Sequence, residues 1–117
     1  MIVRIWRGVA QAGRVAAYRE HLERRVFPRL AGLAGHRGAF LLARVAGEAE
    51  AGPGPEGEEV LVATLWDDLD ALEAFAGPTP RRAVVEPEAR AVLAGFDAEA
   101  AHYEVLLAAP GGLSPGG

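Results

Sequence analysis

The sequence contains no cysteine, lysine or asparagine, and its one serine is Ser114, in a Gly/Pro-rich C-terminal stretch. Without cysteine there are no disulfides, thiol nucleophiles or thiolate metal ligands. Without lysine there is neither a Schiff base nor a P-loop lysine, and the single serine excludes a serine hydrolase. The loss of thiol and amide side chains suits heat resistance, and an Arg-, Ala- and Gly-rich composition fits a GC-rich genome equally well.

The chain also lacks a basic surplus and any long apolar run. Its 12 basic residues, all arginine, face 16 acidic ones, for a formal net charge of −4. That balance does not predict the basic surface that binds nucleic acid or anionic lipid. The apolar runs fall far short of the roughly 20 residues that span a bilayer, and MIVRIWRG lacks a signal-peptide layout. We therefore expect a cytoplasmic protein that binds neither nucleic acid nor membrane.

Half of the residues are hydrophobic (50% of 117), which is enough for one core. Single cores usually occupy about 100–150 residues, so we expect one domain over residues 1–109. The tract GEAEAGPGPEGEE (residues 47–59) predicts a polar loop, and residues 110–117 (PGGLSPGG) predict a flexible tail.

The first half of the chain predicts a strand, a helix and a hairpin. Residues 2–9 are rich in β-branched and aromatic types, as are residues 39–45 and 60–66, and each stretch predicts a strand. After Gly13 the apolar residues recur at spacings of three and four, which predicts an amphipathic helix. Pro28 should end or kink that helix near Phe27.

The second half predicts helices and a last strand. Asp67 and Asp68 suit the start of a helix, because either carboxylate can accept free N–H groups of the first turn. The helix carries an apolar face and should end at Gly77. Residues 87–93 predict a short further helix, and residues 101–109 predict the fourth strand.

The element order β-α-β-β-α-β predicts an α+β, ferredoxin-like domain with a four-stranded antiparallel sheet. Helices would cover one face only, yet both sheet faces are apolar. One face of the third strand carries Val60, Val62, Thr64 and Trp66, and the other carries Leu61, Ala63 and Leu65. A second copy of the sheet would cover the far face, so we expect a homodimer packed sheet to sheet.

With its tryptophan at the end of the third strand, the layout resembles the antibiotic-biosynthesis-monooxygenase-like family of dimeric α+β barrels, over residues 1–108. The resemblance lies in IWRG at 5–8, in LWDD and AFAG within 65–77, and in HYEVL at 102–106. It implies a dimeric α+β barrel with a pocket between sheet and helices in each subunit. The family mixes quinone-forming oxygenases, haem-degrading enzymes and proteins without known activity.

The family's haem site has no counterpart here. Haem-degrading members pair an asparagine on the first strand with a tryptophan on the second helix and a histidine shortly after it. This chain has no asparagine, carries Phe75 on that helix, and has no histidine between His36 and His102. Three scattered histidines also make a poor metal site, so we expect no metal and no cofactor.

The quinone-forming members use no metal or flavin, because oxygen reacts with the phenolate of the substrate. Their assisting asparagine and tyrosine are replaced here by Val62 and Leu72. The resemblance implies a cofactor-independent monooxygenase acting on a phenolic or quinone-type aromatic molecule. Two alternatives stay open: a non-catalytic small-molecule-binding or stress-associated dimer, and a proton-transfer enzyme (isomerase) on the same scaffold.

Trp66 is the first candidate for substrate binding, because an indole can stack on an aromatic ligand. The alternative is that it plugs the end of the barrel. Arg4 could bind an anionic or phenolate ligand, or could pair with Glu104 on the neighbouring strand. The other substrate-binding candidates are Trp6, Tyr18 and Phe75.

His102 and Glu104 are the candidate catalytic residues. They share a face of the last strand while Tyr103 points the other way, and a histidine beside a carboxylate can act as a general base. The alternative is a structural hydrogen bond at the sheet edge or dimer interface. The sequence predicts that His21 is solvated on the exposed face of the first helix.

Overall fold

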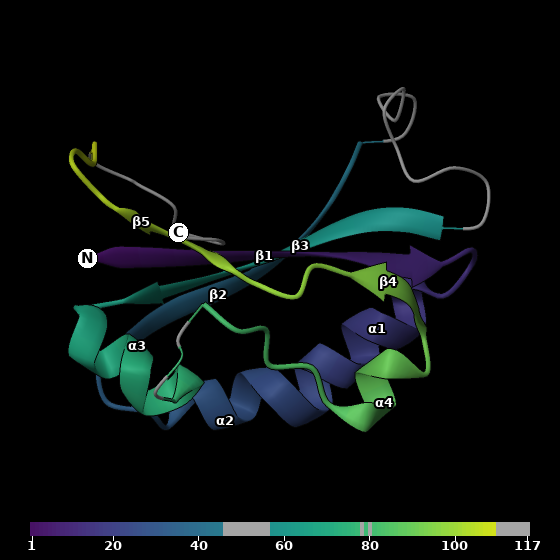
Figure 1. Ribbon diagram of the computed structural model, residues 1–117, viewed down its shortest axis with the longest axis horizontal. Coiled ribbons are helices and arrows are strands. Elements are labelled where there is room, and N and C mark those ends of the chain that lie inside the picture. The colour runs from purple at the N-terminus through teal and green to yellow at the C-terminus, as the bar shows by residue number, and fades with distance from the viewer. Residues whose placement is uncertain (46–56, 78, 80, 110–117) are drawn as a thin grey trace.

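The computed structural model of the protein describes residues 1–45, 57–77, 79 and 81–109 (Figure 1). The expected tail lies outside these residues, as does most of the expected polar loop. The elements are β1 (Ile2–Gln11), α1 (Val15–His21), the π-helix η1 (Leu22–Val26), α2 (Phe27–Ala31), β2 (His36–Ala43), β3 (Gly57–Trp66), α3 (Leu69–Ala76), α4 (Pro87–Arg90), β4 (Leu93–Phe96) and β5 (Ala101–Glu104).

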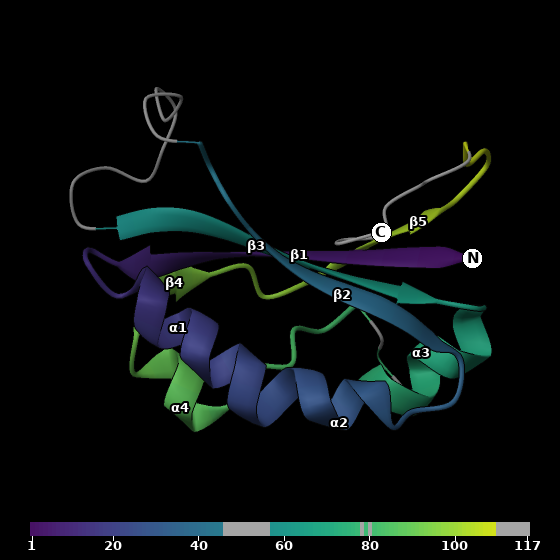
Figure 2. The same ribbon diagram turned by 180° about the vertical axis from the view of Figure 1, so that it is seen from behind.

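The strands form one antiparallel sheet in the order β2-β3-β1-β4, with β5 also paired to β1. The central pair is β1 with β3, in register from Ile2 opposite Trp66 to Gln11 opposite Gly57. The helices all lie on one side of the sheet (Figures 1 and 2). The α+β class is thus confirmed, and the arrangement is compatible with a ferredoxin-like fold.

The fourth strand position is filled by two short strands, so the expected four-stranded sheet has five strands among the described residues. β4 pairs with Gly8–Ala10, with a register shift there, and β5 pairs with Ile2–Ile5. In the break between them, the Trp6 indole donates a hydrogen bond to the Asp97 carbonyl (2.8 Å). The expected strand to residue 109 is too long, because Glu104 already pairs with Ile2 at the start of β1.

The first helical segment continues past Pro28 to Ala31, so of the two expected outcomes the ending near Phe27 is wrong. The helix type does change there, because η1 ends at Val26 and α2 begins at Phe27. Proline has no N–H, so the carbonyl of Arg24 cannot receive an ordinary i+4 hydrogen bond. The backbone widens into the π-helix η1 before Pro28, which then occupies the first turn of α2.

The core lies between the sheet and the helices. Its largest fully buried side chains are Trp66, Leu72 and Val60. The expected cap of α3 is confirmed for Asp68, whose carboxylate accepts a hydrogen bond from the Ala71 N–H (2.9 Å). Gly77 ends the helix with φ +84°, a conformation that favours glycine.

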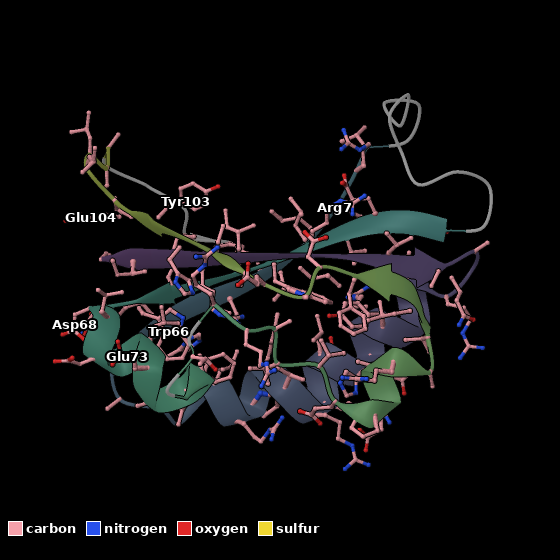
Figure 3. All side chains as sticks on the ribbon, viewed as in Figure 1. Arg7, Trp66, Asp68, Glu73, Tyr103 and Glu104 are labelled. Carbon is pink, nitrogen blue, oxygen red and sulfur yellow. The ribbon has the colours of Figure 1, made fainter. Side chains whose placement is uncertain are left out.

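The other face of the sheet carries no helix among the described residues (Figure 2). A cross-strand row of Phe40, Ala63 and Ile5 crosses this face. Tyr103 lies on the same side, away from the helices (Figure 3), and is 57% exposed, while Leu42 is 45% exposed. No helix in the described part of the chain has the length and apolarity needed to cross a membrane.

Candidate functional site

A cavity of about 60 Å³ lies between the sheet and its helices. β1 contributes Arg4 and Trp6, α1 contributes Tyr18 and His21, and α3 contributes Phe75. The space holds a few water molecules or one small ring. Pockets for larger ligands measure roughly 300–1,000 Å³, so a polycyclic molecule does not fit between these walls as they stand.

Arg4 is the charged group buried in this cavity, with 6% of the residue exposed. Its Nη2 donates to the Arg82 carbonyl (2.9 Å), and its buried Nε has no hydrogen-bond partner among the described residues. The guanidinium lies 5.7 Å from the centre of the Phe75 ring. Burial lowers the pKa of Arg4. A buried cation without a counter-ion is costly, so this side chain is available to an anionic group.

The suggested ion pair between Arg4 and Glu104 does not form. In the sheet register Arg4 lies opposite His102, whereas Glu104 lies opposite Ile2. Glu104 is exposed at the end of the sheet (Figure 3). It borders a shallow depression together with Asp67 and Asp68. Among the described residues Arg4 makes no salt bridge.

Three of the predicted substrate-binding residues, Trp6, Tyr18 and Phe75, line the cavity with Arg4. A Cβ at position 8 would lie 2.8 Å from the Trp6 ring, so Gly8 leaves room for the indole on the sheet. Burial raises the pKa of Tyr18, which keeps the phenol protonated. The structure thus brings together four of the five predicted binding residues.

Trp66, the fifth, does not line the cavity. It is fully buried (0% exposed), and its Nε1 donates to Thr64 Oγ1 (2.9 Å). Its ring stacks on Phe75 with centroids 5.2 Å apart and planes 20° apart, while His36 packs edge-on at 5.0 Å. Trp66 lies between the sheet and the helices (Figure 3). This placement matches the plug alternative: Trp66 supports the wall that Phe75 presents to the cavity.

The predicted catalytic pair also lies outside the cavity lining. His102 is partly buried beside Arg4 in the sheet register, but it does not contribute to the cavity wall. Glu104 is at the sheet end described above. The structure therefore does not bring His102 and Glu104 together with the aromatic candidates.

His21 is a cavity residue that was not predicted from the sequence. It is partly buried rather than solvated, and its ring stacks on Tyr18 with centroids 6.4 Å apart and planes 25° apart. Burial, the largest cause, lowers the pKa of His21. A signal was present in the sequence: His21 follows the inward Tyr18 by three residues, and residues three apart share a helix face.

One ion pair spans the rim of the cavity. Arg29 from α2 contacts Glu86, which precedes α4, and both residues border the cavity. The Nε of Arg29 also donates to the Arg25 carbonyl (2.9 Å). Exposed pairs of this kind contribute little to stability, so this one closes the rim only weakly.

No family model matches this sequence, and no curated protein matches it either. The likeness to the antibiotic-biosynthesis-monooxygenase-like family therefore stays a prediction. In the described part of the chain, no group of three or more His, Asp or Glu side chains is placed to hold a metal ion. The functional argument consequently rests on the cavity and the side chains around it.

Proposed function

We propose that this protein binds a single-ring phenol or hydroquinone in the cavity and acts on it as a cofactor-independent monooxygenase. The observation that carries this proposal is Arg4, a buried guanidinium that has no carboxylate partner within the described residues and lies beside aromatic rings. A fixed cation in an apolar site favours the ionised form of a bound phenol. The aromatic rings of Trp6 and Phe75 supply the apolar surfaces for the ligand ring.

The reaction needs no electron donor other than the substrate itself. A phenoxide passes electrons to oxygen, and in the overall reaction phenol and O₂ give a quinone and water. One oxygen atom enters the ring, the other leaves as water, and the substrate supplies all four electrons. The protein binds the ring, stabilises the negative oxygen and excludes water.

We also propose that the active form is a homodimer, packed sheet to sheet as a dimeric α+β barrel. The face opposite the helices supports this arrangement, because the apolar side chain of Leu42 and the ring of Tyr103 are exposed on it in the single chain. A second copy would bury these side chains in an interface in which the same face meets itself.

A non-catalytic binding role is the second candidate, and one observation favours it. Val62 lines the cavity where the resemblance would place an assisting asparagine. An apolar side chain there binds a ring but offers no hydrogen bond to a reacting oxygen. The proton-transfer alternative assigned its chemistry to His102 and Glu104, which do not line the cavity.

Oxygen consumption by the metal-free protein with single-ring phenols and hydroquinones tests the proposal. We expect uptake above the autoxidation of each compound, falling on the order of 100-fold in Arg4→Met. Methionine matches the length of the arginine stem and removes an unpaired charge, so folding should be retained. Arg19→Met, an exposed position on α1, is the matched control and should keep the wild-type rate. Binding of the same phenols without uptake would support the binding role instead.

A further inference from the structure

Arg4 and His21 line the cavity from different layers of the fold. Arg4 is on β1 in the sheet, and His21 is at the end of α1 in the helical layer. They differ in chemistry, because a guanidinium stays charged in proteins while an imidazole gains and loses a proton near neutrality. The cavity therefore combines a permanent cation with a titratable base.

The surroundings of His21 favour the neutral form of its imidazole. Burial is the main cause of its lowered pKa, and Arg25 and Arg29 lower it further, while Glu88 from α4 opposes them. The stacked Tyr18 from the same helix remains a neutral phenol. An imidazole that is uncharged near neutral pH can accept a proton, so its state suits a general base.

We propose that His21 is the general base of the site and takes the proton of the bound phenol. This inference rests on the proposed function, because it concerns the same ligand. The phenol O–H bond breaks and an N–H bond forms on the imidazole. The electron pair of the broken bond stays on the ligand oxygen beside Arg4, and the Tyr18 ring orients the imidazole by stacking.

The other titratable groups at the cavity are less suited to this step. Glu86 is held in the ion pair with Arg29, so its carboxylate is already engaged at the rim. Tyr18 would first have to lose its own proton, and burial opposes that. His21 thus lines the cavity and has a side chain whose neutral form can accept a proton.

The test follows the proton with 4-nitrophenol, whose anion absorbs visible light while the neutral phenol does not. Titrations are run about one pH unit below the pKa of the free probe, where about a tenth of it is ionised. We expect the wild-type protein to bind the anion and release no net proton, because His21 retains it. Calorimetry in two buffers of different ionisation enthalpy counts the released protons.

His21→Gln should reduce the bound anion about tenfold, and each anion that still binds should release one proton to the buffer. Glutamine is a good helix former, so α1 should persist. His36→Gln, which removes an imidazole outside the cavity lining, should behave as wild type. A wild-type protein that releases the proton itself, or a variant that still retains it, would overturn the role of His21.

NMR titration of the His21 ring supplies a second readout that is independent of activity. A phenoxide bound nearby should raise the pKa of this imidazole, since opposite charges stabilise one another. An unchanged pKa at saturating probe would contradict the inference while leaving the cavity as a binding site. If the probe does not bind at all, the proposed function fails together with the inference.

Discussion

At the scale of single residues, environment decides what each aromatic or charged side chain can do. Trp66 and Trp6 are both buried tryptophans. The Trp66 indole donates its hydrogen bond to Thr64 and does not line the cavity, whereas Trp6 does. Arg4 and Arg7 are close in the chain but differ in their ionic contacts. Arg7 contacts Glu59 at 2.6 Å on the open face, whereas Arg4 makes no such pair in the described structure.

Trp66→Phe should destabilise the fold and leave ligand binding in place. The substitution removes buried ring volume and the hydrogen bond to Thr64, for a cost of about 1–3 kcal/mol in the free energy of unfolding. Urea denaturation measures the loss, and quenching of Trp6 fluorescence by phenols measures binding. Loss of binding in a folded variant would instead place Trp66 in direct contact with the ligand.

At the scale of elements, ion pairs on the uncovered face join neighbouring segments of the sheet, in addition to the backbone hydrogen bonds. Glu59 on β3 contacts both Arg7 on β1 and Arg44, which follows β2. Hydrogen bonding from Arg7 is the largest cause that lowers the pKa of Glu59, and Arg44 adds to it. One carboxylate thus links three neighbouring segments of the sheet.

This arrangement predicts a specific loss of stability in acid. A carboxylate whose pKa is depressed by folding binds protons more readily when unfolded. Its stabilisation is therefore complete above the ordinary glutamate pKa of 4.5 and is lost as pH falls through the lower folded value. Glu59→Gln should flatten that part of the stability profile, measured by thermal unfolding at a series of pH values. Glu73→Gln on α3, whose side chain is exposed, is the control and should leave the profile unchanged.

At the scale of the whole molecule, one face of the sheet is covered by helices, and no helix in residues 1–45, 57–77 or 81–109 covers the other (Figures 1 and 2). The covered face holds the cavity, while the uncovered face carries exposed apolar side chains such as Leu42 and Tyr103 beside the ion pair of Arg7 and Glu59. Water excluded from such a surface favours association, which is the physical basis for the proposed sheet-to-sheet dimer.

Leu42→Glu should convert the proposed dimer to a monomer, because it places a charge on the uncovered face where two copies would meet. Leu42 is 45% exposed, and the matched control Leu69→Glu changes a residue 51% exposed at the start of α3, on the helical side. Analytical ultracentrifugation at micromolar concentration reads out the mass. A wild-type monomer at that concentration, or a dimer that persists in Leu42→Glu, would contradict the proposed interface.

The sequence by itself determined where most strands and helices form and which side chains share a face of β3. Period-two and period-four patterns are local, so Val60, Thr64 and Trp66 could be assigned to one side without knowing their neighbours. The cap at Asp68 was equally readable, because it joins residues three apart.

Only the tertiary structure decided the contents of the site. The break between β4 and β5 and the position of His21 depend on which distant segments meet. So does the lack of a hydrogen-bond partner for Arg4 Nε within the described part of the chain. The π-helix before Pro28 also changes which side of the first helical segment the later residues lie on, because its hydrogen-bond spacing differs from that of an α-helix. Burial and register are non-local quantities, so a linear pattern identified the candidate side chains but could not tell a cavity wall from a plug behind it.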